Sequence, residues 1–413
     1  MRVLWISHFV PYPPIGGAPQ RSFNLLRRLA VENEVHFFGL SLRGHQAQVQ
    51  DIAAAEAALA EFCSSVTLLP ARFRSATAGK IWSAGWGLLS ARAYGQVWLD
   101  SARARRIVAE LIGRHRPDVL HVDSLMVAGL APRMPAAPAV LNHHNIESHM
   151  MQRRAENAGP AERWYMRREA RLLRGYERRT ATRFDRHLVV SALDGERLQE
   201  ILPGARWSVV ANGVDTSFFA PQSVSERASE IVFSGRMNWY PNEHAMLRFL
   251  STLWPEVKAA APQARLTIVG MNPTEKLYRL SADLPDVTIT GFVPDVRDLL
   301  ARAPVYICPM LDGGGTRLKI LDALSLAKAI VATPMAVEGI EIHDGEHALV
   351  RPFGPDFVLG ILALLDSPSL RSRLAQAARS LALSRYDWAA ISAAHRTALE
   401  SAIAGSGSGG LPA

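Results

Sequence analysis

The feature that most constrains this chain is an alternation of short, continuous apolar runs with stretches of helical periodicity, and the alternation occurs twice. The first series of apolar runs covers 2–9, 34–40, 65–70, 118–124, 139–145, 187–192 and 208–214. The second covers 230–237, 265–270, 287–293, 305–310 and 329–334. Short runs rich in β-branched residues, with helical stretches such as 19–30 between them, are typical of buried parallel strands. The pattern predicts an α/β fold of two doubly wound, Rossmann-like domains.

The length of the chain agrees with two domains, because 413 residues exceed what one ordinary core accommodates. The polar, proline-containing segment 215–229 separates the two series and predicts a linker. We therefore expect an N-terminal domain over 1–214 and a C-terminal domain over 230–385. A final helix is expected over 386–404, and the Gly- and Ser-rich residues 405–413 are expected to form a flexible tail.

Composition favours a globular protein of a reducing compartment. Hydrophobic residues make up 48% and charged residues 20% of the chain, and no run approaches the roughly 18 apolar residues of a membrane span. The apolar stretch at the start is short and interrupted by proline and glycine, unlike a secretory signal. Cys63 and Cys308 lie far apart and form no metal-binding pattern. These observations predict a cytoplasmic protein.

The positive charge is concentrated in the first half. Residues 1–215 carry 28 Lys and Arg against 19 Asp and Glu, a net +9, while the whole chain is +8. The segment 153–186 alone has 11 Arg against 5 acids. Either this is a solvated helix with paired charges, or it attracts an anionic membrane face or lipid-linked substrate. No nucleic-acid-binding module is present, so nucleic acid is not an expected partner.

The Trp-rich stretch 80–99 has two interpretations as well. It is either a core helix or a surface that enters the membrane interface or holds a lipid tail. Together with the arginine-rich segment, it supports the hypothesis of peripheral contact at the inner face of the plasma membrane.

A glycine-rich loop follows the apolar run 305–310. Gly313, Gly314 and Gly315 precede Thr316, and a helical pattern begins at about Arg317, with Lys319 beside it. The first amides of a helix lack internal partners, glycine lets a ligand approach the backbone, and cations add charge. This combination predicts a diphosphate site. The alternative is a turn with solvated cations, and the GxxxxGK[ST] spacing of a Walker loop is absent.

Several polar residues lie at predicted strand ends or one helical turn beyond a loop. Asp322 follows Lys319 by one turn, where it accepts hydrogen bonds from a sugar hydroxyl pair or serves as an intrahelical partner. His144 ends a predicted strand and is expected at a cleft, with the neighbouring His143 on the opposite face. A structural histidine is the alternative.

Three further polar residues end predicted strands in the first half. His121 and Asp123 share a face of their strand, where contact with an acceptor is one interpretation, and His8 is a similar case.

No metal or cofactor is expected. The paired acids in 283–286 and 295–298 lie in loop or helix-start positions, where acids commonly cap helices, and no histidine or carboxylate cluster is seen at ligand spacing. Arginine, lysine and a helix N-terminus stabilise a departing nucleoside diphosphate without Mg²⁺.

The order and spacing of these motifs resemble the retaining glycosyltransferases of the GT-B fold, in particular family four, glycosyl transferases group 1. The resemblance is carried by segments 2–30, 209–219, 233–245, 289–300 and 313–341. It covers nearly the whole chain. It implies two Rossmann-like domains facing across a cleft, the first holding the acceptor and the second the donor, with the final helix returning to the first domain.

The resemblance also implies residue roles in the second domain. Asp322 takes the place of the second Glu of the family's Glu-x7-Glu motif, which binds ribose, whereas the first Glu falls at Gly314. Backbone amides around Gly315 and Thr316 are therefore expected to face the sugar and phosphates. Arg236 matches the arginine that contacts the diphosphate, and the lysine that often follows it is missing. Arg317 and Lys319 are expected to supply that charge.

In the first domain, Gly16 and Gly17 match the loop near the phosphates and acceptor, and His144 matches a histidine near the reacting sugar. The implied activity is transfer of a sugar, with retention, from a nucleotide diphosphate-sugar to a saccharide or lipid-linked saccharide in exopolysaccharide or lipopolysaccharide assembly. Two alternatives stand beside it: a nucleotide-sugar 2-epimerase, and a non-catalytic nucleotide-sugar-binding subunit. Gly314 and the missing lysine are the features that the last alternative rests on.

Overall fold

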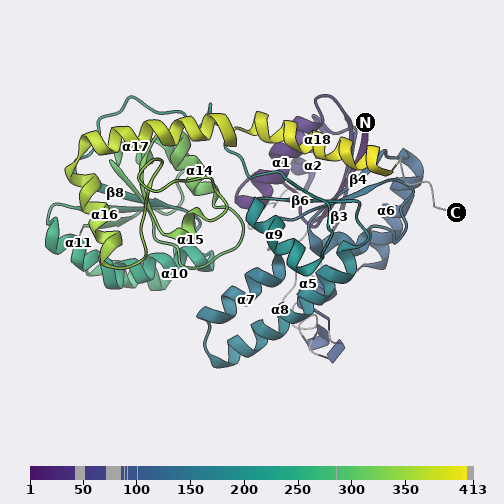
Figure 1. The fold of residues 1–413 in the computed structure, drawn as a ribbon, viewed down its shortest axis with the longest axis horizontal. Coiled ribbons are helices and arrows are strands. Elements are labelled where there is room, and N and C mark those ends of the chain that lie inside the picture. The colour runs from purple at the N-terminus through teal and green to yellow at the C-terminus, as the bar shows by residue number, and fades with distance from the viewer. Residues whose placement is uncertain are drawn as a thin grey trace. The chain divides into compact units, whose positions relative to one another are not determined.

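The computed structural model describes residues 1–41, 52–70, 85–87, 89–90, 92–99, 101–284 and 286–406. The chain forms two compact units: unit 1 is Met1–Ala211 with the chain from Ile391 onward, and unit 2 is Asn212–Ala390. Figure 1 shows the elements of each. Of the expected tail, residues 407–413 lie outside the described residues.

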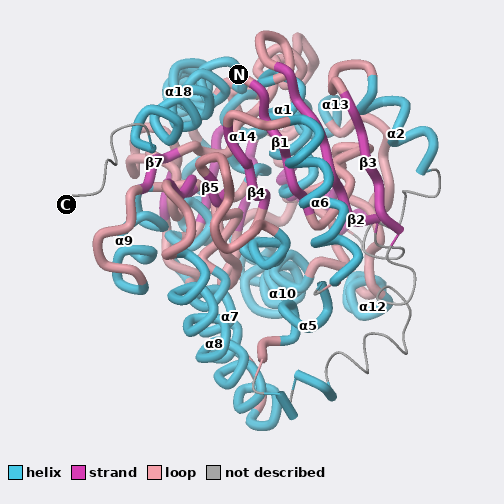
Figure 2. Tube along the Cα trace, turned by 90° about the vertical axis from the view of Figure 1, so that its right-hand side faces the viewer, coloured by secondary structure: helices cyan, strands magenta, loops and turns pink. Residues whose placement is uncertain are grey.

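Unit 1 is built on a seven-stranded parallel sheet in the order β3-β2-β1-β4-β5-β6-β7. Figure 2 shows its strands in magenta, with β7 and β3 at the two edges. The strands are β1 (Arg2–Ser7), β2 (Glu34–Ser41), β3 (Ser65–Pro70), β4 (Val119–Asp123), β5 (Ala139–Asn142), β6 (Arg186–Val189) and β7 (Trp207–Val209). The central strands are buried on both faces, as their continuous apolar runs predict.

The helices of unit 1 flank this sheet. They are α1 (Gly17–Leu29), α2 (Ile52–Ala60), α5 (Tyr94–Leu99), α6 (Ala102–His115), α7 (Glu147–Asn157), α8 (Pro160–Ala181), α9 (Ala192–Ile201) and the greater part of α18 (Trp388–Ser406). Helices α7 and α8 lie side by side and extend beyond the sheet as a hairpin, as Figures 1 and 2 both show. Since the expected final helix, α18, crosses the division at Ala390, most of it belongs to unit 1.

Unit 2 is built on a six-stranded parallel sheet in the order β10-β9-β8-β11-β12-β13. The strands are β8 (Glu230–Ser234), β9 (Arg265–Val269), β10 (Val287–Ile289), β11 (Val305–Cys308), β12 (Ala329–Ala332) and β13 (Leu349–Val350). The helices are α10 (Tyr240–Arg248), α11 (Trp254–Ala260), α12 (Glu275–Ala282), α13 (Arg297–Arg302), α14 (Leu318–Ser325), α15 (Pro334–Val337), α16 (Pro355–Asp366) and α17 (Pro368–Leu381). The prediction of two parallel, doubly wound α/β domains is confirmed.

The structure differs from the sequence-based expectations in three places. The two-residue strand β13 was not expected, because it is too short to leave an apolar run. The predicted linker 215–229 lies within unit 2, where Ser325 Oγ donates to the Phe219 carbonyl oxygen at 2.8 Å. The division itself falls after Ala211, three residues before the predicted end of the first domain.

The Trp-rich stretch 80–99 contains a core helix, which agrees with the first of its two interpretations. Helix α5 is buried from Gln96 onward, and Trp98 belongs to the hydrophobic core of unit 1. Trp86 is 48% exposed, while residues 80–84, 88 and 91 lie outside the described residues. Within the described part of the chain, no helix combines the length and apolar character that crossing a bilayer requires.

Candidate functional site

Each sheet has one point where the winding reverses: between β1 and β4 in unit 1, and between β8 and β11 in unit 2. Open α/β sheets bind ligands in the crevice at the carboxyl ends of these strands. Every site residue expected from the sequence lies near one of the two points. In unit 1 they lie in β4, in the loop after β5 and between the end of β1 and the start of α1; in unit 2 they lie in the loops after β8 and β11 and on α14.

In unit 2, the glycine-rich loop connects β11 with α14, as the sequence predicts. Gly313 and Gly315 have φ values of 131° and 61°, which L-residues with side chains rarely adopt. A Cβ on Gly313 would also lie 3.2 Å from Arg317 Nη2. No side chain caps the N-terminus of α14, and its first turn contains no acid, so its positive end is not neutralised locally.

The two predicted cations of this loop differ in position. Arg317 is buried; its Nη1 donates to the Gly315 carbonyl oxygen, and its Nη2 lies 3.0 Å from Met335 Sδ, so the guanidinium braces the loop. Lys319 is partly exposed and donates from Nζ to Asn242 Oδ1 at 2.5 Å. Its Nζ also lies 4.3 Å from the ring centre of Phe233. Burial lowers the pKa of Lys319 to about 8, which leaves it mostly charged at pH 7.

The loop after β8 carries Arg236. Asn242 Nδ2 donates to the Arg236 carbonyl oxygen at 2.9 Å while its Oδ1 accepts from Lys319, so Asn242 connects the two loops at the reversal point. The Arg236 guanidinium is partly exposed and has no hydrogen-bond or ion-pair partner among the described residues. A Cβ on Gly235 would lie 2.6 Å from Lys319 Nζ, so glycine at this position makes room for the ammonium.

Asp322 lies on α14 behind this loop. Its Oδ1 is inaccessible to solvent and accepts no hydrogen bond within the described part of the chain. Burial raises the pKa of Asp322 to about 7, against the opposing effect of Lys319. A carboxylate oxygen that lacks a donor is costly to bury. The geometry therefore favours a ligand-binding role over that of an intrahelical partner.

The side chain of Thr316 is bonded to the segment 209–219, one of the segments that carry the family resemblance. Asn212 Nδ2 donates to Thr316 Oγ1 at 2.6 Å. Arg236, Thr316, Arg317, Lys319 and Asp322 are thus brought together in unit 2, with Gly314 and Gly315 in the same loop. Their roles toward a ligand stay predictions.

In unit 1, Asp123 is the centre of a buried polar cluster at the end of β4. Its Oδ2 accepts from Ser22 Oγ at 2.7 Å, Trp5 Nε1 at 3.3 Å and Ser7 Oγ at 3.4 Å, and its Oδ1 accepts from Asn142 Nδ2 at 2.7 Å and His144 Nε2 at 2.9 Å. Burial opposes ionisation, but the neighbouring imidazoles and the Ser22 hydroxyl hold the pKa of Asp123 well below its usual range.

His144 is the one partly exposed member of this cluster. Because an ionised carboxylate only accepts, His144 Nε2 donates to Asp123, and Nδ1 is left for another partner. Asp123 thereby fixes both the tautomer of the neutral ring and its orientation. The expectation that His144 acts on a substrate is compatible with this geometry and stays a prediction.

His143 and His121 are structural. His143 is buried against His187, with their ring nitrogens 3.1 Å apart. His121 is fully buried, stacks on Trp5 and lies 3.3 Å from His395 Nε2 of α18, and burial lowers its pKa to about 3. The interpretation that His121 and Asp123 touch an acceptor is wrong, because neither side chain reaches the surface.

Gly16 and Gly17 lie at the start of α1, after the loop that follows β1. Gly16 has φ of 95° and is the N-cap residue, and Gly17 is the first helical residue. Helix α1 has no side-chain cap and no acid in its first turn. It also supplies Ser22 to the Asp123 cluster.

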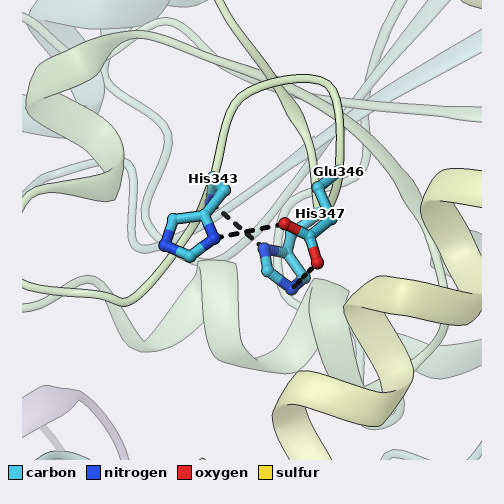
Figure 3. A group of neighbouring side chains, drawn as sticks. All are labelled: His343, Glu346 and His347. Atoms are coloured by element: carbon cyan, nitrogen blue, oxygen red, sulfur yellow. Dashed lines mark hydrogen bonds and ion pairs between the residues drawn. The ribbon is translucent and has the colours of Figure 1, made fainter.

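One group of metal-ligating side chains does occur among the described residues, contrary to the expectation of none at ligand spacing. His343, Glu346 and His347 lie on a loop of unit 2, with one ligand atom from each within 4.8 Å of the others (Figure 3). However, His347 Nδ1 accepts from the His343 amide at 3.1 Å, which places the proton on Nε2, the nitrogen facing Glu346. A ligating histidine instead donates from its second nitrogen. A hydrogen-bonded turn accounts for the group.

Several polar residues on which the two sites depend were not expected from the sequence. Asn242 lies in segment 233–245, which carries part of the family resemblance, and this segment was the available signal. Asn142 and Ser22 had no such signal, because their contacts with Asp123 join segments about 20 and 100 residues apart.

Solved structures share this architecture. Sucrose-phosphate synthase of Thermosynechococcus elongatus aligns over 98% of this chain and 99% of its own, with TM-score 0.72 and 13% identity. HepE of Anabaena, solved with UDP and glucose, aligns over 97% of this chain and 100% of its own, with TM-score 0.66 and 14% identity. Two Rossmann-like parallel-sheet units of this kind define the GT-B class of fold.

Family models identify the chain more closely. The Glycosyltransferase Family 4 model matches residues 15–218, and the Glycosyl transferases group 1 model matches residues 228–367. The chain belongs to this family of glycosyltransferases.

Individual curated proteins also resemble parts of this chain. Phosphatidyl-myo-inositol mannosyltransferase of Mycobacterium tuberculosis is 27% identical over 214 residues, which are 48% of this chain and 54% of that protein. Glycogen synthase of the same species is 25% identical over 300 residues, 68% of this chain and 67% of that protein. The chain thus matches about half the length of the mannosyltransferase.

Proposed function

We propose that the protein transfers a sugar from a nucleotide diphosphate-sugar to a saccharide or lipid-linked saccharide acceptor. The observation that carries the proposal is the polar centre of unit 2. There a partly exposed Arg236, the ammonium of Lys319, an uncapped helix N-terminus and the unpartnered Oδ1 of Asp322 surround a glycine-rich loop at the reversal point of the sheet.

In this proposal the diphosphate lies against the loop at Gly314, Gly315 and Thr316, and the Asp322 carboxylate accepts from the ribose hydroxyls. Positive charge fixed in place before the reaction stabilises the departing diphosphate. HepE, a structural neighbour, was solved with UDP-glucose, and TarM of S. aureus with UDP, which supports a nucleotide-sugar donor.

The proposal includes retention of configuration and no requirement for a metal. The acceptor hydroxyl approaches from the face of the leaving group, and the departing phosphate takes its proton, so no protein nucleophile is needed. In this proposal His144, whose ring is oriented by Asp123, contacts the transferred sugar through Nδ1. Adding a chelator is expected to leave the rate unchanged, and loss of activity that Mg²⁺ restores would contradict metal independence.

The proposal also includes the cellular location and the pathway. We expect the protein to act in exopolysaccharide or lipopolysaccharide assembly at the inner face of the plasma membrane. We expect it to contact the membrane through the basic first half of the chain. The similarity to phosphatidyl-myo-inositol mannosyltransferase, whose name specifies a lipid acceptor, supports an acceptor of this kind.

A panel of nucleoside diphosphates tests the donor site directly. A ligand that binds only the folded state raises the midpoint of thermal unfolding, and one that is present at 100 times its dissociation constant stabilises by about 2.7 kcal/mol. We expect UDP or GDP to raise the midpoint and the matching sugar donor to be consumed when acceptor is added. If no nucleoside diphosphate shifts the midpoint, the proposed donor site is absent.

Consumption of donor also separates the rival functions. A nucleotide-sugar 2-epimerase would convert the donor without any acceptor and release an isomeric sugar. A non-catalytic subunit would bind the nucleotide and turn over nothing. The observation that disfavours the epimerase is Gly314, which leaves the position of the family's first Glu without a carboxylate.

A further inference from the structure

Helix α8 carries a continuous exposed stripe of one aromatic and four cationic side chains. Trp164, Arg167, Arg171, Arg174 and Arg178 are exposed and are separated by three, four, three and four residues. This spacing places them on one face of the helix. We call these five residues the arginine face.

Most of the positive charge of this face is not compensated. Arg167, Arg171 and Arg178 have no hydrogen bond or ion pair with any described residue. Arg174 donates from Nη2 to the main-chain carbonyl oxygen of Glu200 at 3.2 Å. Its charge is partly balanced, because it opposes the rise that burial causes in the pKa of Glu177. A solvated helix with paired charges, the first of the two interpretations of 153–186, does not describe this face.

Two of the three acids of the same helix point inward. Glu169 is buried, accepts from the Tyr94 amide at 2.8 Å and pairs with Arg168. Glu177 is buried and accepts from both the amide and the hydroxyl of Ser148 on α7. The third acid, Glu162, is exposed in the first turn. The helix thus keeps two of its carboxylates inside while the five residues of the arginine face are outside.

A groove runs beside the arginine face. It encloses about 380 Å³ and is lined by Arg171, Arg174, Gly175 and Arg178 of α8 and by Glu200, Ile201 and Pro203 at the end of α9. Three guanidiniums outweigh the one carboxylate of this lining. Arginine binds two phosphate oxygens at once, so three guanidiniums along one groove suit a phosphate-bearing headgroup.

Exposed apolar side chains continue the surface beyond Trp164. Arg168 Nη2 donates to the Gly87 carbonyl oxygen at 2.8 Å, so this part of the chain lies against α8. Here Trp86 is 48% and Leu89 83% exposed, and Trp164 itself is 64% exposed. Exposed apolar side chains do not contribute to the binding of a small soluble anion. Aromatic rings beside cations are, however, typical of surfaces at a membrane interface.

We propose that the arginine face docks on an anionic phospholipid bilayer. The groove takes a lipid phosphate between Arg171, Arg174 and Arg178, and Trp164, Trp86 and Leu89 lie at the level of the headgroups. This inference rests on the membrane contact in the proposed function and names the surface and the lipid chemistry responsible for it.

Sedimentation with vesicles tests the inference on the full chain. The parent protein is expected to bind phosphatidylcholine vesicles that contain phosphatidylglycerol, and to bind pure phosphatidylcholine weakly. The variant R171A/R174A/R178A is expected to lose about 100-fold in partition coefficient, at about fivefold per arginine near an anionic surface. W164S is expected to weaken binding by about fivefold, including at high salt, because apolar contact is not screened.

The matched control removes the same charge from α6 of the same unit. R103A/R106A/R114A alters three exposed arginines there and is expected to change vesicle binding by less than about threefold. Equal losses in the two triple variants would show that only net charge matters and would overturn the inference. Displacement of the parent from vesicles by millimolar inorganic phosphate, with W164S behaving as the parent, would indicate a soluble-anion site and overturn it as well.

A thermal shift with the nucleoside diphosphate panel, run on the same samples, separates this inference from the proposed function. If R171A/R174A/R178A binds nucleotide as the parent does but no longer binds vesicles, the docking surface is supported. Vesicle binding through α8 in a chain that binds no nucleotide would overturn the proposed activity and leave the docking surface supported. Unimpaired vesicle binding by the triple variant would overturn the docking surface.

Discussion

The polar centres of the two units occupy equivalent points of two similar sheets, yet they differ in how their carboxylates are satisfied. Asp123 of unit 1 receives five hydrogen bonds from within its own unit, and its pKa is held well below the usual range. Asp322 of unit 2 has an inaccessible oxygen that no described residue donates to, and burial raises its pKa to about 7.

The difference shows which centre is complete by itself. A fully satisfied buried network rigidifies its surroundings and fixes the groups at its edge, here His144. An unsatisfied oxygen beside a cation and an uncapped helix is a cost that a hydroxyl-bearing anionic ligand would remove. The cluster in unit 1 is therefore satisfied from within its own unit, whereas one oxygen of Asp322 in unit 2 accepts no hydrogen bond from the described residues.

The largest expected effect comes from removing the centre of the unit 1 cluster. D123A deprives Trp5, Ser22 and Asn142 of their buried acceptor, so we expect a loss of about 3–5 kcal/mol in the free energy of unfolding by urea denaturation. E110A, an exposed acid on α6, is the control and is expected to change stability by less than about 0.5 kcal/mol. Similar free energies of unfolding for D123A and E110A would contradict the central role of Asp123 in unit 1.

The second effect concerns the cations of unit 2. Charge-assisted hydrogen bonds contribute about 1.5–3 kcal/mol each, so R317A/K319A is expected to weaken nucleoside diphosphate binding by about 100-fold or more in calorimetry. K276A, on α12, removes an exposed lysine and is the control. Since Arg317 also braces the loop, K319A alone is needed as well and is expected to account for about tenfold.

A smaller effect is expected from crowding Lys319 without removing it. In G235A the new Cβ would lie 2.6 Å from Lys319 Nζ and 2.8 Å from Asn242 Nδ2, which displaces the ammonium. We expect about a tenfold loss in nucleotide affinity while the fold is retained. G113A, at an open position of α6, should bind nucleotide as the parent does. Unchanged affinity in G235A would remove Lys319 from the binding site.

The smallest expected effect is a pH dependence of stability. The folded state binds a proton at Asp322 that the unfolded chain releases between about pH 4 and 7, so this carboxyl lowers stability as pH rises through that window. D322N removes the contribution, and its melting temperature relative to the parent is expected to rise from pH 4 to pH 8. Glu147, whose pKa burial also raises to about 7, cancels in this difference. A difference that is independent of pH would contradict the raised pKa of Asp322.

Much of the fold could be predicted from the amino-acid sequence. The twelve apolar runs coincide with twelve of the thirteen strands found among the described residues, although several strands end before the runs do. For example, β5 ends at Asn142 and β8 at Ser234, so the remaining residues of each run form the loops that carry His144 and Arg236. A hydrophobic pattern reports burial, and a strand end depends on hydrogen bonds to a neighbouring strand, which local sequence does not contain.

The site divides in the same way. Glycines with positive φ, cations at a helix start and an acid one turn later are local patterns, so the sequence by itself determined the loop at 313–317 and the parallel, two-domain architecture around it. Only the tertiary structure decided that Asp123 is satisfied by five donors, that one oxygen of Asp322 receives none from the described residues, and that α8 buries Glu169 and Glu177 while its arginine face is exposed. The physical reason is that a hydrogen bond or an unpaired charge depends on which distant segments meet, and that is fixed by packing rather than by spacing along the chain.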